Sequence, residues 1–137
     1  MTIASDYSNA REVQQLIRDE VERAGFDADS QFAIKLALEE ALINAIKHGN
    51  KLDKRKNVRV EWNISPAAAE IIIEDEGPGF DRKKVPNPTE DGNLEKLTGR
   101  GILLIESYMS DVQWSNGGRR VKLVKKNDRR TPGVKTA

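Results

Sequence analysis

Residues 36–50 read LALEEALINAIKHGN, and the spacing of their apolar side chains predicts a helix packed into a core. Three polar residues interrupt this pattern, and a core helix has no packing reason to keep them: Glu39, Glu40 and Asn44. Glu40 and Asn44 are four residues apart, so a helix places their side chains on one face, one turn apart. A carboxylate beside a carboxamide on an otherwise buried helix indicates a candidate site.

Two interpretations of Glu40 and Asn44 are open on these residues alone. Both side chains could lie on the exposed side of an amphipathic helix, or they could form a site for a metal ion and phosphate. Little of this helix is left to be exposed, and asparagine is a poor residue for a helix interior unless its amide is used. An asparagine oxygen is a hard ligand suited to Mg²⁺, and a neighbouring carboxylate can act as a general base.

Composition excludes several classes of protein. The 137 residues fit one domain, and 23 basic residues balance 22 acidic ones, which argues against a general binder of nucleic acids or membrane surfaces. The chain has no cysteine, so disulfides and thiolate metal sites are excluded. The N-terminal segment has neither the basic nor the apolar region of a signal peptide, and no apolar run is long enough to span a membrane. We therefore expect a cytoplasmic protein.

The elements before and after the central stretch follow from local patterns. Residues 1–5 are compatible with an edge strand, and residues 10–24 have the apolar spacing of an amphipathic helix, with Asn9 as its N-cap. The central helix is expected from about residue 30 to 47 or 48. The charged segment 50–57 is expected to be a solvated loop.

Strand patterns dominate the second half of the chain. Four segments have the alternating or continuous apolar residues of β-strands: 58–64, 69–75, 111–115 and 119–125. Between them, residues 81–98 have no strong periodicity and are expected to form a long loop, and a third helix is expected to start near Gly101. Helices and strands thus come in blocks, which predicts an α+β two-layer sandwich. Its sheet would be mixed or antiparallel, with helices on one face.

Asp75-Glu76-Gly77-Pro78-Gly79 directly follows the most apolar strand. It could be an ordinary glycine-rich turn. However, an aspartate at the end of such a strand is half-buried and needs hydrogen-bond donors, and the exocyclic amine of a base is one candidate. The two glycines would let the backbone come close to a planar ligand.

Gly99, Arg100 and Gly101 stand where the third helix is expected to begin. A helix N-terminus with flanking glycines is suited to bind an anion such as phosphate, although many helices simply start with glycine. The segment is neither a Walker loop nor a dinucleotide-binding fingerprint.

In this order, the three motifs resemble the N, G1 and G2 boxes of the GHKL ATPases, which share the Bergerat fold. EEALINAIKHG, DEGPGFD and TGRGILLIESYMSDV are most similar to the boxes of the anti-sigma-factor serine/threonine kinases. The resemblance covers residues 1–125 as a single domain. Residues 126–137 are then a polar tail, expected to be disordered.

The resemblance implies a role for each residue of the first two motifs. Asn44 would hold a Mg²⁺ ion that bridges the phosphates of ATP, and Glu40 would be the general base that activates the incoming hydroxyl. Asp75 would accept a hydrogen bond from the adenine amine, and Gly77 and Gly79 would let the ring lie close.

For the third motif, the resemblance implies that Gly99, Arg100 and Gly101 cradle the phosphates, and that the segment from Phe80 to Thr98 forms a lid over ATP. The sequence departs from the family pattern on the last hairpin. Many relatives have a Gly-Thr pair there, whose threonine helps to hold adenine through water, whereas here Gly118 is followed by arginines.

The implied function is that of an anti-sigma-type protein kinase. It would bind a sigma factor or another regulator and use Mg-ATP to phosphorylate a serine on an antagonist protein. The resemblance also implies that the protein can form a homodimer, and that it contacts neither nucleic acid nor membrane directly. One alternative is a non-catalytic module that keeps the fold and sequesters a partner, and another is a detached ATPase domain of a histidine kinase.

Overall fold

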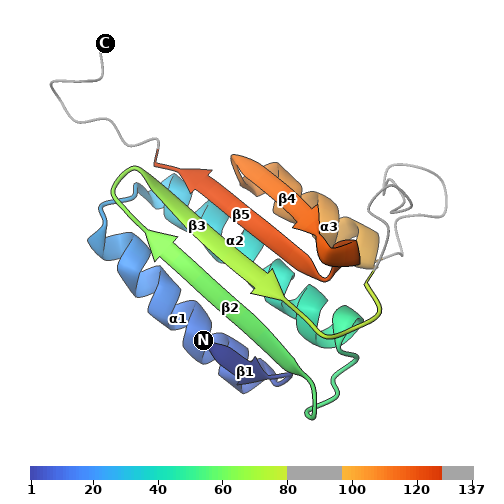
Figure 1. The fold of residues 1–137 in the computed structure, drawn as a ribbon. Helices are drawn as coiled ribbons and strands as arrows, with labels where there is room; N and C mark the ends of the chain where they lie inside the picture. Colours follow the sequence, from blue (N-terminus) through green and yellow to red (C-terminus); the bar gives the residue numbers. More distant parts are fainter. Residues whose placement is uncertain (80–96, 128–137) are drawn as a thin grey trace, which may run out of the picture.

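The computed structural model describes residues 1–79 and 97–127, and the side chains of residues 1–79 and 102–127. In these ranges three α-helices cover one face of a five-stranded sheet (Figure 1). The elements are, in chain order, β1 (Thr2–Ala4), α1 (Tyr7–Arg23), α2 (Ala28–Ile43), η1 (Asn44–Gly49), β2 (Asn57–Ile64), β3 (Ala68–Glu74), α3 (Leu97–Tyr108), β4 (Asp111–Ser115), η3 (Asn116–Gly118) and β5 (Arg120–Lys126).

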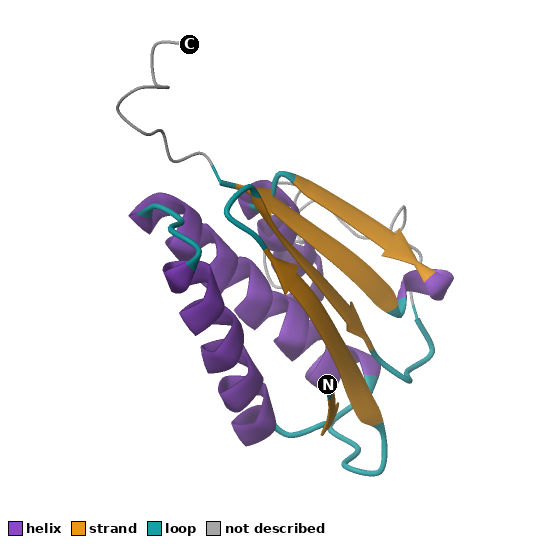
Figure 2. Cartoon of the chain, turned by 60° about the vertical axis from the view of Figure 1, so that its left-hand side comes forward, coloured by secondary structure: helices purple, strands orange, loops and turns teal. Residues whose placement is uncertain are grey.

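The sheet has the strand order β1-β2-β3-β5-β4, and every neighbouring pair is antiparallel. Figure 2 shows the helices together on one side of the sheet. The predicted α+β two-layer sandwich is therefore confirmed, with an antiparallel sheet.

The first helix, α1, begins three residues earlier than predicted. Its N-cap is Asp6, whose carboxylate accepts a hydrogen bond from the Ser8 N–H at 2.7 Å, and not Asn9. The cap prediction was wrong because aspartate and asparagine cap equally well, and the earlier residue adds a turn to the helix. The amphipathic pattern itself is confirmed, since α1 buries Ala10, Val13, Ile17 and Val21.

The second helix, α2, is the central element of the helical layer. It contacts α1, α3 and β5, which explains why apolar residues surround so much of it. Its N-cap is Asp27, which accepts from the Ser30 N–H at 2.7 Å. Small and branched residues let the neighbouring helices come close, and among them Ala37, Leu38 and Leu42 are at most 1% exposed.

The helix continues beyond Ile43 as a π-helix, η1, and not as the α-helix that was expected to reach residue 47 or 48. Just after η1, the Asn50 N–H donates to the Ala45 carbonyl at 2.8 Å, a bond from residue i to i−5 that widens the turn. Asn50 itself is 0% exposed. The expectation that the loop is solvated from residue 50 onward was therefore wrong at its first residue.

The two faces of the sheet differ in character. Alternate residues of β2 and β3, such as Val58, Val60, Ile71 and Ile73, are buried under the helices. The opposite face carries charges that pair across strands, for example Lys122 with Glu70 at 3.1 Å. This alternation is the period of two that the sequence predicts.

The end of the last strand lies slightly further along the chain than expected. β5 includes Lys126, and the Asn127 N–H donates to the Ala67 carbonyl at 2.9 Å. The rest of the expected tail, residues 128–137, lies outside the described residues. Among the described helices, none combines the length and the apolar character needed to cross a membrane.

Candidate active site

Glu40 and Asn44 lie where α2 passes into η1. The Asn44 N–H donates to the backbone carbonyls of Glu40 and Ala41, so the two side chains follow one another on one side of the helix. Both residues are half-buried. Neither the Glu40 carboxylate nor the Asn44 amide forms a hydrogen bond or an ion pair with the residues that the structure describes.

The environment of Glu40 makes its carboxylate a stronger base. Burial raises the pKa of Glu40 above the ordinary 4.5, and the negative charge of Glu39 raises it further. A raised pKa brings a carboxylate closer to the range in which a general base is most effective. The structure thus distinguishes the two adjacent glutamates, because Glu39 is exposed.

Asp75 is the first residue after β3 and is only 7% exposed. Its N–H donates to the Arg119 carbonyl at 2.9 Å, and its Oδ1 accepts from the Gly77 N–H at 2.8 Å. Burial raises the pKa of Asp75, against the opposing effects of the Gly77 hydrogen bond and the Arg119 charge. No described residue donates to Oδ2, so this oxygen can accept a hydrogen bond from a ligand amine.

A glycine–glycine contact brings the first two motifs together. A Cβ atom added to Gly77 would lie 2.1 Å from the Gly49 carbonyl oxygen, and a Cβ on Gly49 would lie 2.5 Å from Asp75 Cγ. The end of η1 and the turn after β3 can meet only because neither residue has a side chain. The helix that carries Glu40 and Asn44 therefore ends against the carboxylate of Asp75.

The second glycine of the turn makes a contact of the same kind. Gly79 has a φ of 78°, and a Cβ there would lie 2.1 Å from the Gly117 carbonyl oxygen. The turn after β3 is thus enclosed between η1 on one side and η3 on the other.

Gly99, Arg100 and Gly101 lie within α3, which begins at Leu97. The expected helix start near Gly101 was therefore too late by four residues, although the glycines do belong to the N-terminal part of the helix. The helix α3 packs on α2 and η1, so it belongs to the same layer as Glu40 and Asn44. The side chain of Arg100 and most of the expected lid, residues 80–96, lie outside what the structure describes.

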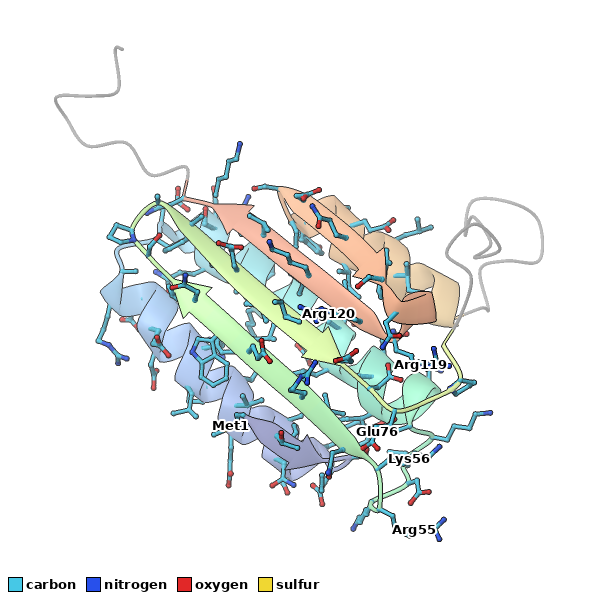
Figure 3. All side chains as sticks on the ribbon, in the orientation of Figure 1. Met1, Arg55, Lys56, Glu76, Arg119 and Arg120 are labelled. Carbon is cyan, nitrogen blue, oxygen red and sulfur yellow. The ribbon has the colours of Figure 1, made fainter. Side chains whose placement is uncertain are left out.

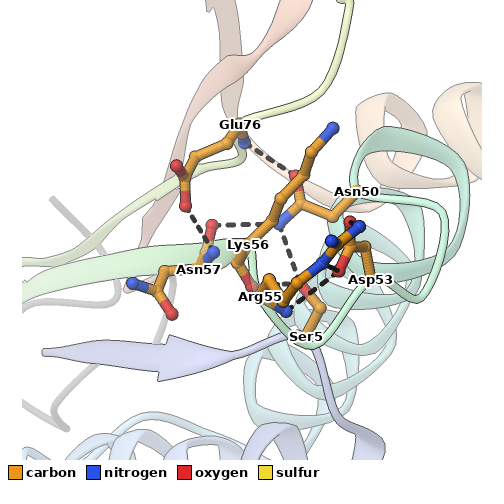
Figure 4. A network of polar contacts seen from close by, with 7 residues as sticks. All are labelled: Ser5, Asn50, Asp53, Arg55, Lys56, Asn57 and Glu76. Carbon is orange, nitrogen blue, oxygen red and sulfur yellow. Dashed lines mark hydrogen bonds and ion pairs between the residues drawn. The ribbon is translucent and has the colours of Figure 1, made fainter.

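Asn50 supports this site but was not identified from the sequence. Its Nδ2 donates to Ser5 Oγ at 2.8 Å and to the Asn57 carbonyl at 2.9 Å, and its Oδ1 accepts from the Glu76 N–H at 2.7 Å (Figure 4). It thereby ties the residue after Asp75 to β2 and to Ser5, which directly follows β1. The sequence contains no signal for this role, because Asn50 opens a segment rich in charged residues.

Arg119 was noticed in the sequence only as a departure from the family pattern. In the structure its guanidinium donates to the backbone carbonyls of Gly77 at 2.6 Å and Pro78 at 3.1 Å. Figure 3 shows Arg119 beside the turn that follows β3. The arginine thus holds the glycine-rich turn from the side of the last hairpin.

The residues present fit a nucleotide and a magnesium ion. Asn44 offers an amide oxygen with no partner in the described part of the chain, and Mg²⁺ accepts such ligands while sharing phosphates and water. The described residues contain no cluster of three His, Cys, Asp or Glu side chains that could hold a metal by themselves. A metal ion held by Asn44 would therefore need the phosphates of a substrate as further ligands.

Several known proteins have sequences similar to this chain. The chain is 34% identical over 97 residues to the serine-protein kinase RsbW of Listeria innocua, a match that covers 66% of this chain and 62% of the relative. The serine-protein kinase RsbW of Bacillus subtilis is 30% identical over 100 residues, covering 69% and 62%. The matches thus span about three fifths of the length of these relatives.

The model of the histidine kinase-like ATPase domain matches residues 3–125, which include every described helix and nearly all of β5. The matched range takes in the antiparallel sandwich and all three motifs in their order. The chain therefore belongs to the histidine kinase-like ATPase domain family.

Proposed function

We propose that this protein is a serine/threonine protein kinase of the anti-sigma-factor type, which transfers the γ-phosphoryl group of Mg-ATP to a serine of an antagonist protein. The observation that carries the proposal is the contact between Gly49 and Gly77. It places the end of the helix bearing Glu40 and Asn44 against the buried Asp75 carboxylate. Family membership and the similarity to serine-protein kinases support the same conclusion.

The nucleotide would be held at its two ends. Asp75 Oδ2 would accept a hydrogen bond from the adenine amine, and the turn at Gly77 and Gly79 would let the ring approach the backbone. Asn44 would hold the magnesium ion, whose charge would neutralise the phosphates. The N-terminal part of α3, with Gly99, Arg100 and Gly101, would bind the phosphate oxygens.

Glu40 would carry the proton transfer. The serine Oγ of the antagonist forms a bond to the γ-phosphorus while the bond from that phosphorus to the β-γ bridging oxygen breaks, and ADP leaves with that oxygen. The hydroxyl proton passes to the Glu40 carboxylate, whose raised pKa suits this role. Phosphoryl transfer needs little more than positioning and charge neutralisation, which the residues around the site would supply.

The proposed partners follow from the anti-sigma assignment. The chain would bind a sigma factor or a similar regulator, and its substrate would be the antagonist that competes for this interaction. A homodimer and a cytoplasmic location are part of the same proposal.

A second function has one observation in its favour. Arg119 stands where many relatives have the threonine that helps to hold adenine, so the protein could instead sequester a partner without catalysis. Such a module would keep the fold and would bind its regulator without consuming ATP.

One phosphorylation experiment separates these functions. The protein would be incubated with labelled ATP, Mg²⁺ and the small antagonist encoded by a neighbouring gene, using wild type, Glu40→Gln and Glu39→Gln. We expect Glu40→Gln to lower the rate about 100-fold or more, because it removes the base, whereas the exposed Glu39→Gln should retain activity. Glu39→Gln is the matched control, since it makes the same chemical change one residue away.

Three results would decide against parts of the proposal. Undiminished labelling with Glu40→Gln would show that another group is the base. The absence of ATP binding at millimolar concentration would remove the nucleotide site altogether. Binding of a regulator without any labelling by the wild type would favour the sequestering module.

A further inference from the structure

The side chain of Arg119 is committed to the backbone of two loops. Its Nε donates to the Gly77 carbonyl at 2.6 Å, its Nη2 to the Pro78 carbonyl at 3.1 Å, and its Nη1 to the Asn116 carbonyl at 3.1 Å. All three nitrogens of the guanidinium therefore serve main-chain carbonyls. Within the described residues, Arg119 forms no ion pair with a carboxylate.

The backbone of Arg119 is joined to the same turn. Its carbonyl accepts the Asp75 N–H at 2.9 Å, so one residue is bonded to Asp75 by its main chain and to the two following loop carbonyls by its side chain. Asp75 in turn accepts from the Gly77 N–H. These bonds leave the turn from Asp75 to Pro78 little freedom to change its shape.

A neighbouring glycine, Gly117, makes room for this arrangement. A Cβ on Gly117 would lie 2.9 Å from Arg119 Nη1, closer than a real Cβ atom comes to another heavy atom. The flat, forked guanidinium suits three carbonyls with fixed positions, whereas a lysine ammonium offers one compact charge on a flexible stem. The arginine is thus matched to its surroundings in shape as well as in charge.

We propose that Arg119 is the positioning residue of the adenine-binding pocket. It holds the turn from Asp75 to Gly79 in its nucleotide-binding shape before the nucleotide arrives. This inference rests on the proposed function, in which Asp75 binds the adenine amine. Ordering the turn in advance lowers the entropic cost of binding. The protein therefore binds the adenine of the nucleotide more tightly. The arginine thereby serves the end of the pocket at which many relatives use a threonine, by a different contact.

The charge of Arg119 also favours binding of adenine by Asp75. Burial raises the pKa of Asp75, and the Arg119 guanidinium partly opposes this effect. Arg119 therefore favours the ionised carboxylate, which is the form that accepts a hydrogen bond with both oxygens.

The test uses the full chain with Arg119→Met, Arg119→Lys and the control Arg120→Met. Arg120 is the next residue on the same hairpin, is also half-buried, and forms no side-chain hydrogen bond or ion pair with the part of the chain that the structure describes. Hydrogen exchange of the Gly77 and Gly79 amides in the free protein reports on the turn itself. Fluorescent ATP measures nucleotide affinity, and competition by Mg-tripolyphosphate measures binding of the phosphate part alone.

We expect Arg119→Met to accelerate exchange at both glycines and to weaken ATP binding about tenfold, with tripolyphosphate binding unchanged. Arg119→Lys should lie between Arg119→Met and wild type, because it keeps the charge but not the fork. Arg120→Met should behave as wild type in every measurement. If the substitution only disturbed the fold, it would instead weaken the binding of tripolyphosphate and of ATP equally.

Wild-type exchange and wild-type ATP affinity in Arg119→Met would overturn the inference, as would equal losses for ATP and tripolyphosphate. Failure of the wild type to bind ATP is a different result, since it would refute the proposed function and with it the adenine-binding pocket. In that case, faster exchange at Gly77 in Arg119→Met would still show that the arginine holds the turn. The two failures are therefore distinguishable.

Discussion

Replacing Asn50 by alanine should destabilise the protein strongly, although Asn50 is not among the proposed site residues. The side chain is completely buried and links three segments of the chain. Asn50→Ala removes its hydrogen bonds to Ser5 Oγ, to the Asn57 carbonyl and from the Glu76 N–H. Ser5 Oγ still donates to the Lys56 carbonyl at 2.8 Å, whereas the Asn57 and Glu76 backbone groups lose these bonds.

The size of the effect follows from these bonds. A typical internal hydrogen bond contributes about 1 kcal/mol to stability, so three account for about 3 kcal/mol. The space left by the carboxamide adds a smaller packing cost. Against a total stability of about 5–15 kcal/mol for a domain, the loss is large.

Urea unfolding followed by circular dichroism measures this loss. With a slope of about 2 kcal/mol per molar urea, the midpoint should fall by about 1.5 M, while the slope stays unchanged. The matched control is Asn63→Ala, which removes an exposed asparagine on β2. Its free energy of unfolding should change by no more than about 0.5 kcal/mol.

The reasoning would be refuted if Asn50→Ala lowered the free energy of unfolding by less than about 1 kcal/mol, the value of a single bond. It would also be refuted if Asn63→Ala caused an equal loss. Either result would mean that the buried network contributes little to the stability of the fold.

Three further predictions concern the site. Burial and the charge of Glu39 raise the pKa of Glu40, and a general base works only when deprotonated. The kinase rate should therefore fall with decreasing pH, with a midpoint above the ordinary 4.5. Glu39→Gln should lower that midpoint in a pH–rate profile. The pKa of Asp75 is raised in the folded state, so the stabilising contribution of this carboxyl group is present at low pH and is lost as pH rises through the folded pKa. Asp75→Asn should therefore not lower the melting temperature at neutral pH. The same substitution should weaken ATP binding at least about tenfold in calorimetry. Gly77→Ala places a Cβ 2.1 Å from the Gly49 carbonyl oxygen, and should cost about 2 kcal/mol or more in urea unfolding.

Much of the fold could be predicted from the sequence because strands and helices have short periods. The alternation at residues 58–64 predicted a strand that the structure places at Asn57–Ile64, and residues 111–115 form β4 as expected. Burial on one face repeats every two residues in a strand, so a few residues suffice to show it. The blocks of strands and helices then indicated the layered α+β fold.

Element ends and the π-helix could not be predicted in the same way. Asp6 and Asn9 are equally good caps, and the choice between them depends on the contacts of the whole helix. The same residues that form η1 would fit an α-helix, and bonds such as that from the Asn50 N–H to the Ala45 carbonyl show the wider turn. Such differences are small in local energy and are decided by packing.

The sequence by itself determined the identity and the order of the three motifs, and it distinguished Glu40 and Asn44 as polar residues on an apolar helix. Only the tertiary structure decided that Gly49 lies against Asp75 and Gly77, that Asn50 is buried, and that Arg119 holds the turn. The physical reason is distance along the chain. Motifs are read from neighbouring residues, whereas these contacts join segments that meet only when the sheet and the helical layer have packed together.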